Sequence, residues 1–326
     1  MKRILIIRFS SIGDIVLTTP VIRCIKTQMP ETEIHFLTKK CFAEVLQNNP
    51  YIDNLYYLES SILKTIMKVS AFNYDIIIDL HSNFRTNLIK LLANKPSYSF
   101  NKKNIYKWLL VNFKIDLLPD IHIVDRYLNT AKKIGITNDN KGLDFFTSTD
   151  VLPLEKLGIK EIGNYVAFVI GAKHNTKALS ITKIIDIINE IAKSVVLIGG
   201  KDDAEKANNI IKNTSNKNVF NAVGTMSIQE SALFIKNADV VITHDTGFMH
   251  IAAAFNKKII SIWGSTVPKF GMYPYMPQNK ELVTIIEQKE LKCRPCSKIG
   301  FKECPKKHFD CMNKINAEDI YKLANK

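Results

Sequence analysis

Residues 240–263 read VVITHDTGFMHIAAAFNKKIISIW, which has the pattern of a strand, a loop, a helix and a second strand. A short β-branched run leads into polar residues and Gly247. A small apolar helical segment follows, and then the apolar run Lys258–Trp263. Strands that alternate with helices in this way are typical of parallel sheets covered on both faces. We therefore predict an α/β protein.

The same alternation extends through the rest of the chain, which at 326 residues is long enough for two domains. We predict further strands at residues 3–7, 33–37, 74–80, 165–170 and 195–198, and helices at 14–29, 181–192, 203–213 and 227–237. Two such series predict two doubly wound domains, residues 1–155 and 156–326, with the last helix able to pack back on the first domain. The break falls in the mixed stretch 140–163.

The composition excludes several classes of protein. Hydrophobic residues make up 46% and charged residues 23%, which are globular values rather than those of disordered, collagenous or coiled-coil chains. No apolar run approaches the roughly 18 residues that span a bilayer. The run Ile4–Ile7 is ended by Arg8, too early for a signal peptide. We therefore expect a cytoplasmic protein with reduced cysteines.

In doubly wound sheets, ligands bind outside the carboxyl ends of the strands, so we expect a site in a cleft between two such edges. After the first strand, Gly13 allows close approach of a ligand and Asp14 starts a helix. Asp14 either caps this helix or serves as a general base. Neither a dinucleotide fingerprint nor a Walker loop is present here.

Two segments of the second half suit an anion. The free N–H groups at Thr246 and Gly247 would open a helix toward a phosphate, with Asp245 and His250 close by. A capped helix with a packed histidine is the simpler reading, and a metal site of His244, Asp245 and His250 fits the spacing poorly. Thr176 and Lys177, in the loop after the strand at 165–170, suit a diphosphate, although a solvated loop is the alternative.

The stretch 81–115 has seven basic residues, no acidic residue and interleaved aromatic residues, within a chain of formal net charge +14. Lys103, Lys107 and Lys114 would share one helix face, and Arg85 and Lys102 add charge nearby. We expect this side to meet an anionic membrane or a phosphorylated acceptor. A nucleic acid and a plainly solvated helix face are the alternatives.

Four cysteines lie close together near the end of the chain, with His308 among them. Cys293, Cys296, Cys304 and Cys311 have the spacing C-x2-C-x7-C-x6-C. This pattern in a reduced protein suggests a structural zinc ion, with four free thiols as the alternative.

Taken together and in order, these segments resemble glycosyltransferase family 9, the ADP-heptose:lipopolysaccharide heptosyltransferases. The resemblance is carried by RFSSIGDIVLTTPVIR at 8–23, DLHSNFRTN at 79–87, GAKHNTK at 171–177, IGGKDD at 198–203, MSIQESALFIKNADVVITHDTGFMHIAAA at 226–254, and the cysteine tail. It implies a GT-B architecture of two facing Rossmann-like domains with an interdomain cleft. It also implies inverting transfer of a sugar from a nucleotide diphosphate to a lipid-linked glycan.

The resemblance also assigns roles to residues. The catalytic base falls on Asp14 and the diphosphate-binding lysine on Lys177. The remaining donor-side positions are Gly13, Thr176, Met226, Gln229, Asp245, Thr246, Gly247 and His250, while Arg85, Lys102, Lys103 and Lys107 lie on the acceptor and membrane side. Catalysis would need no metal ion.

The partners implied are ADP-heptose, a lipid A–core acceptor and the cytoplasmic face of the inner membrane, with no nucleic acid. Ala178-Leu179-Ser180 and Gln229 depart from the family pattern on the donor side, so another nucleotide sugar is an alternative. Other readings are a non-catalytic GT-B protein, a nucleotide-sugar epimerase and a basic nucleic-acid binder.

Overall fold

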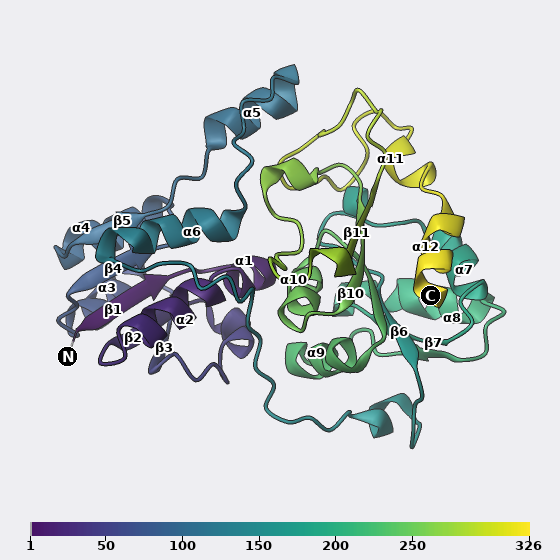
Figure 1. Cartoon of the computed structure of the whole chain (residues 1–326), viewed down its shortest axis with the longest axis horizontal. Coiled ribbons are helices and arrows are strands. Elements are labelled where there is room, and N and C mark those ends of the chain that lie inside the picture. Colours follow the sequence, from purple (N-terminus) through teal and green to yellow (C-terminus); the bar gives the residue numbers. More distant parts are fainter. Residues whose placement is uncertain (1) are drawn as a thin grey trace. The chain divides into compact units, whose positions relative to one another are not determined.

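The computed structural model describes residues 2–326, which form two compact units (Figure 1). Unit 1 comprises residues 2–103 and 121–146, and unit 2 comprises residues 104–120 and 147–326. The segment 104–120 therefore belongs with the second unit, although it lies well before residue 155 in the sequence. Within the described chain, every helix is too short or too polar to cross a membrane.

Unit 1 is built on a five-stranded parallel sheet with the order β3-β2-β1-β4-β5. The strands are β1 (Arg3–Ile7), β2 (Glu33–Thr38), β3 (Asn54–Tyr57), β4 (Ile76–Asp79) and β5 (Ser97–Ser99). In the central strand β1, the side chains of Ile4 to Ile7 are all fully buried. This continuous burial is what a parallel strand covered on both faces requires.

The helices of unit 1 are α1 (Ile12–Val16), α2 (Thr19–Gln28), α3 (Ile62–Ser70), α4 (Phe84–Ala93) and α6 (Ile123–Ala131). Leu5 and Ile7 of β1 pack in one cluster with Ile66 of α3 and Ile89 of α4. The single helix predicted from residue 14 to 29 is two helices. Pro20 lies in the first turn of α2, where its missing N–H and fixed φ favour the start of a helix.

Unit 2 is built on a six-stranded parallel sheet with the order β11-β10-β9-β6-β7-β8. The strands are β6 (Tyr165–Val169), β7 (Ser194–Ile198), β8 (Val219–Asn221), β9 (Val240–His244), β10 (Lys258–Trp263) and β11 (Val283–Glu287). One core cluster joins Phe168 of β6, Ile184 of α7, Ile210 of α8 and Ile320 of α12.

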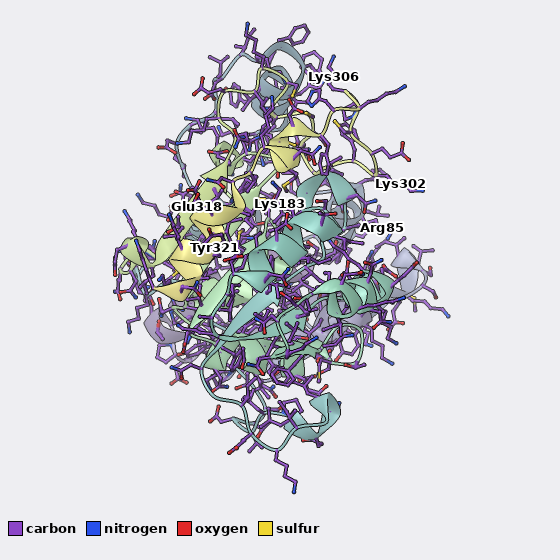
Figure 2. The ribbon with its side chains drawn as sticks, turned by 90° about the vertical axis from the view of Figure 1, so that its right-hand side faces the viewer. Arg85, Lys183, Lys302, Lys306, Glu318 and Tyr321 are labelled. Carbon is purple, nitrogen blue, oxygen red and sulfur yellow. The ribbon has the colours of Figure 1, made fainter. Side chains whose placement is uncertain are left out.

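The helices of unit 2 are α5 (Asn104–Phe113), α7 (Ile181–Asn189), α8 (Ala204–Asn213), α9 (Ile228–Asn237), α10 (Gly247–Ala254), α11 (Asp310–Asn313) and α12 (Ala317–Asn325). Figure 2 shows Lys183 of α7 beside α12, which carries Glu318 and Tyr321. Lys183 Nζ donates to the Ile315 carbonyl at 2.9 Å. The last helix therefore packs within unit 2, and its packing on the first domain stays a prediction.

Each sheet has a point where the chain reverses its direction of strand addition. In unit 1 this point lies between β1 and β4, and in unit 2 it lies between β6 and β9. Ligands of open α/β sheets bind at the carboxyl ends of the strands at such points. The loops after these four strands are therefore where each unit would hold a ligand.

Candidate functional site

In unit 1, the loop after β1 and the short helix α1 position Asp14. Its Oδ2 accepts hydrogen bonds from the Ser11 backbone N–H at 3.1 Å and the Ser11 hydroxyl at 2.8 Å. Its Oδ1 lies 2.6 Å from Arg8 Nη2. The helix-capping role that the sequence allowed for Asp14 is thus present, because Ser11 is the N-cap of α1. Gly13 is buried within the same helix.

The surroundings keep Asp14 ionised. Burial alone would raise its pKa, but the positive charge of Arg8 and the hydrogen bonds from Ser11 outweigh burial and lower the pKa below its ordinary value of 3.8. The side chain nevertheless remains 22% exposed. A carboxylate that is charged, fixed and open to solvent on one side is suited to accept a hydrogen bond from a bound hydroxyl group.

Arg8 is the residue that orients Asp14, and no sequence pattern singled it out as a site residue. Its guanidinium is buried and donates to the Ser10 carbonyl at 2.8 Å and to the Tyr127 hydroxyl at 2.9 Å. It also donates to the Leu80 carbonyl, just beyond β4. These contacts hold the guanidinium rigidly against the carboxylate, and they join the loops that follow β1 and β4.

His81 is a second residue that the sequence did not single out. It follows β4, and its ring centroid lies 4.9 Å from that of Phe9 in the loop after β1. Burial, with the charges of Arg8 and Lys102, lowers its pKa to about 4. The imidazole is therefore neutral at physiological pH, and its buried Nδ1 has no hydrogen-bond partner among the described residues. His81 thus places a buried polar atom with no described partner just after the carboxyl end of β4.

In unit 2, Lys177 and Asp245 meet at the reversal point of the sheet. Lys177, after β6, places its Nζ 2.6 Å from Asp245 Oδ2, which directly follows β9. The same oxygen accepts a hydrogen bond from the Thr266 hydroxyl at 2.8 Å. The two predicted donor-side residues are thus brought together, with Lys177 partly exposed and able to meet an anion.

The start of α10 lies beside this pair. Thr246 is the N-cap residue and Gly247 the first residue of the helix, so the unpaired N–H groups of its first turn follow directly after Asp245. These groups and the Lys177 ammonium form a cationic edge that suits a diphosphate.

Among the predicted donor-side residues of unit 2, the structure buries Thr176, Gln229 and His250. His250 and Gln229 are each no more than 5% exposed, and Met226 is half-buried before α9. The Thr176 hydroxyl contacts Ser265 Oγ at 2.9 Å and accepts a hydrogen bond from the Phe301 N–H at 2.8 Å. Because that hydroxyl is used inside the protein, Thr176 fixes the loop that carries Lys177, and its expected contact with phosphate is corrected.

The structure also gives no support to a metal site in the HDTG segment, residues 244–247. His244 is fully buried, and its Nε2 accepts a hydrogen bond from the Leu179 N–H at 3.0 Å. Burial lowers its pKa to about 3, so it is a neutral acceptor that anchors the loop after β6. Its Nε2 is therefore already occupied by a backbone N–H group.

The basic face expected on the helix at 103–114 is also corrected. Lys107 is buried, and its ammonium lies 5.7 Å from the ring centroid of Phe270. Lys114 Nζ donates to the Cys293 and Pro295 carbonyls at 3.1 and 2.7 Å. Both ammonium groups are therefore directed at their own unit and not at a common solvent face. Lys102 and Lys103 are half-buried, and Arg85 is exposed on α4.

The four cysteines near the end of the chain were expected to hold a zinc ion. Cys293 Sγ lies 3.9 Å from His308 Nε2, but the described residues contain no group of three or more candidate ligands placed to hold a metal ion. Burial, and after it the neighbouring Cys293, raises the pKa of Cys296 to about 12. Figure 2 shows Lys302 and Lys306 on the loop between Cys296 and Cys311. The structure gives the zinc expectation no support.

Comparison with known proteins places this geometry in a family. The model of glycosyltransferase family 9 (heptosyltransferase) matches residues 62–306. The chain belongs to glycosyltransferase family 9. It is therefore a glycosyltransferase, and the resemblance read from the sequence is confirmed.

Individual relatives of this family 9 chain agree with that placement. Lipopolysaccharide heptosyltransferase 1 of Campylobacter coli is 25% identical, over 99% of this chain and 98% of the relative. Among solved structures, a glycosyl transferase family 9 protein from Veillonella parvula has a TM-score of 0.78 at 22% identity, covering 99% of this chain and 96% of its own. ADP-heptose lps heptosyltransferase II of E. coli has a TM-score of 0.76 at 18% identity, covering 100% and 98%. The predicted α/β, GT-B fold class is confirmed.

Proposed function

We propose that this glycosyltransferase moves a heptose from ADP-heptose to the core of a lipopolysaccharide acceptor, with inversion at the anomeric carbon. It would work at the cytoplasmic face of the inner membrane without spanning it. The relatives named for heptose transfer support the sugar and the acceptor class. The observation that carries the proposal is the cationic edge of unit 2, where Lys177 lies beside Asp245 and the start of α10.

On the donor side, this edge would hold the diphosphate of the nucleotide sugar. As the bond between the anomeric carbon and the phosphate oxygen breaks, negative charge develops on the departing ADP. The Lys177 ammonium and the N–H groups of α10 would stabilise that charge. Thr176 would contribute by holding the loop, and Asp245 by positioning the lysine. These protein groups can do so without a metal ion.

On the acceptor side, Asp14 would align the attacking hydroxyl group and accept its proton. The oxygen of that hydroxyl forms a bond to the anomeric carbon on the face opposite the departing ADP, which gives inversion. Because the pKa of Asp14 is lowered, the carboxylate is a weak base, and it takes the proton late, once the new C–O bond has made the hydroxyl acidic. Arg8 and Ser11 would keep it oriented.

Calorimetric titration of the purified chain with ADP, UDP, GDP and CDP tests the donor assignment. We expect ADP to bind at least tenfold more tightly than the other three. Selection of another nucleotide would keep the transferase and change the donor, in line with the departures at Gln229 and Ala178. Absence of binding by any nucleotide would contradict the proposal and favour a non-catalytic protein.

Arg8 provides a test based on pH. In Arg8→Met the lowering influence of the guanidinium is lost, while burial continues to raise the pKa of Asp14. The base is active when deprotonated, so the acid limb of kcat/KM should move to higher pH. Arg8→Lys, which keeps a positive charge, should move it less. An acid limb that stays in place in Arg8→Met would contradict the assignment of Asp14 as the base.

A structural zinc ion stays a prediction of the cysteine spacing alone. Elemental analysis of protein purified without chelator checks it. About one equivalent of zinc per chain would establish the site, and less than about half an equivalent would count against it.

A further inference from the structure

Helices α3 and α4 of unit 1 are neighbours (Figure 1), and both expose large apolar side chains. On α3, Leu63 and Met67 are four residues apart, and Met67 is 73% exposed. On α4, Phe84 and Leu91 are seven residues apart, and they are 81% and 73% exposed. Residues at these spacings share one side of a helix. With Leu92, these side chains define what we call the α3–α4 face.

The charges on these two helices are all of one sign. The helices carry the four basic residues Lys64, Lys68, Arg85 and Lys90 and no acidic residue. Lys68 and Lys90 form ion pairs with Glu59 and Asp79 in neighbouring segments. Lys64 and Arg85 are exposed, so their charge is available to a partner.

We propose that the α3–α4 face docks on an anionic lipid bilayer. The exposed apolar side chains suit the hydrocarbon interior of such a bilayer, and the cations between them suit its negatively charged surface. The two helices carry no carboxylate that would oppose this attraction. Five large apolar side chains exposed on two helices in contact are typical of a surface that binds a partner. The inference rests on the proposal that the acceptor is a lipid-linked glycan.

Helix α5 exposes apolar residues too, including Trp108, but it lacks this charge pattern. Its Lys107 is buried, and Lys114 just beyond it is bound to backbone carbonyls of the same unit. Asp116, in the segment after it, adds a negative charge. The charge pattern therefore favours binding of an anionic bilayer by the α3–α4 face, and it does not favour such binding by α5.

The α3–α4 face also lies next to the acceptor-side edge of unit 1. Phe84 and Arg85 begin α4 only three and four residues after His81, and Asn83 caps the helix by accepting a hydrogen bond from the Thr86 N–H at 3.0 Å. One end of the docking surface thus lies directly after the loop that carries His81. A bilayer bound there would bring the sugars of a membrane-anchored acceptor toward the carboxyl end of β4, next to β1.

Co-sedimentation of the full chain with vesicles tests this proposal. The wild type should bind vesicles of phosphatidylglycerol mixed with phosphatidylcholine, and bind pure phosphatidylcholine far less. Met67→Ser/Leu91→Ser should lower the partition coefficient at least tenfold, because two apolar side chains no longer enter the bilayer. Lys64→Ser/Arg85→Ser should lower it by about fivefold per charge, on the anionic vesicles only.

The matched control is Val151→Ser/Ile299→Ser, which removes two exposed apolar side chains from unit 2 and should leave vesicle binding unchanged. Melting temperature and ADP affinity are measured for every variant, so loss of folding or of the donor site is seen separately from loss of docking. Wild-type binding by Met67→Ser/Leu91→Ser would overturn the proposal. So would a loss found only in Trp108→Ser, because the contact would then lie on α5.

Discussion

Asp14→Asn is expected to abolish measurable sugar transfer while leaving ADP binding unchanged. The amide is nearly isosteric with the carboxylate and still occupies its place beside Ser11, but it cannot take a proton from the acceptor hydroxyl. Removal of a general base costs about 10²- to 10⁴-fold in rate. Steady-state kinetics with saturating donor measures the loss, which should appear in kcat.

Asp120→Asn is the matched control, because Asp120 is an exposed carboxylate in unit 2. Its kcat should equal that of the wild type. If Asp14→Asn retains more than about a tenth of the wild-type rate, the role of Asp14 is limited to capping α1. Another residue must then be the general base.

Lys177→Ala is expected to weaken ADP binding by about 10- to 100-fold. A hydrogen bond that involves a charged group contributes about 1.5–3 kcal/mol, and the substitution also leaves Asp245 without its cation beside the diphosphate. Both effects act against an anionic ligand. Isothermal titration with ADP measures the affinity, and titration with adenosine shows whether the loss belongs to the phosphates.

Lys173→Ala provides the comparison for this variant, because Lys173 is an exposed lysine on the same loop after β6. It should change the ADP affinity by less than threefold. Equal losses in the two variants would mean that only the general charge of the loop matters. Unchanged affinity in Lys177→Ala would exclude the proposed phosphate contact.

The sheets and the reversal points could be predicted because buried parallel strands are almost wholly apolar. Predicted strands at 3–7 and 165–170 correspond to β1 and β6 within one residue. Asp14, Lys177 and Asp245 could then be assigned to the carboxyl edges of the sheets, because they lie in the loops that follow such strands. The order of the strands determines which of these strand ends are adjacent. The pairing of Lys177 with Asp245 follows from the adjacency of β6 and β9.

The roles of several side chains depend on contacts between distant residues, which the periodicity of the sequence does not reveal. The charge of Lys107 suggested a solvated face, but its apolar stem and the ring of Phe270 favour burial. Thr176 is a hydroxyl residue in a polar loop, and its contacts with the distant Ser265 and Phe301 show that the hydroxyl is used inside the protein. Arg8 and His81 act through residues more than 70 positions away in the chain.

Sugar transfer itself tests the central claim most directly. Purified chain is incubated with ADP-heptose and a lipopolysaccharide core acceptor that lacks heptose, and the product is analysed by mass spectrometry while released ADP is counted. We predict an acceptor heavier by one heptose and ADP released in equal amount, with neither seen for Asp14→Asn. An unmodified acceptor, whether or not ADP is released, would contradict the proposed function.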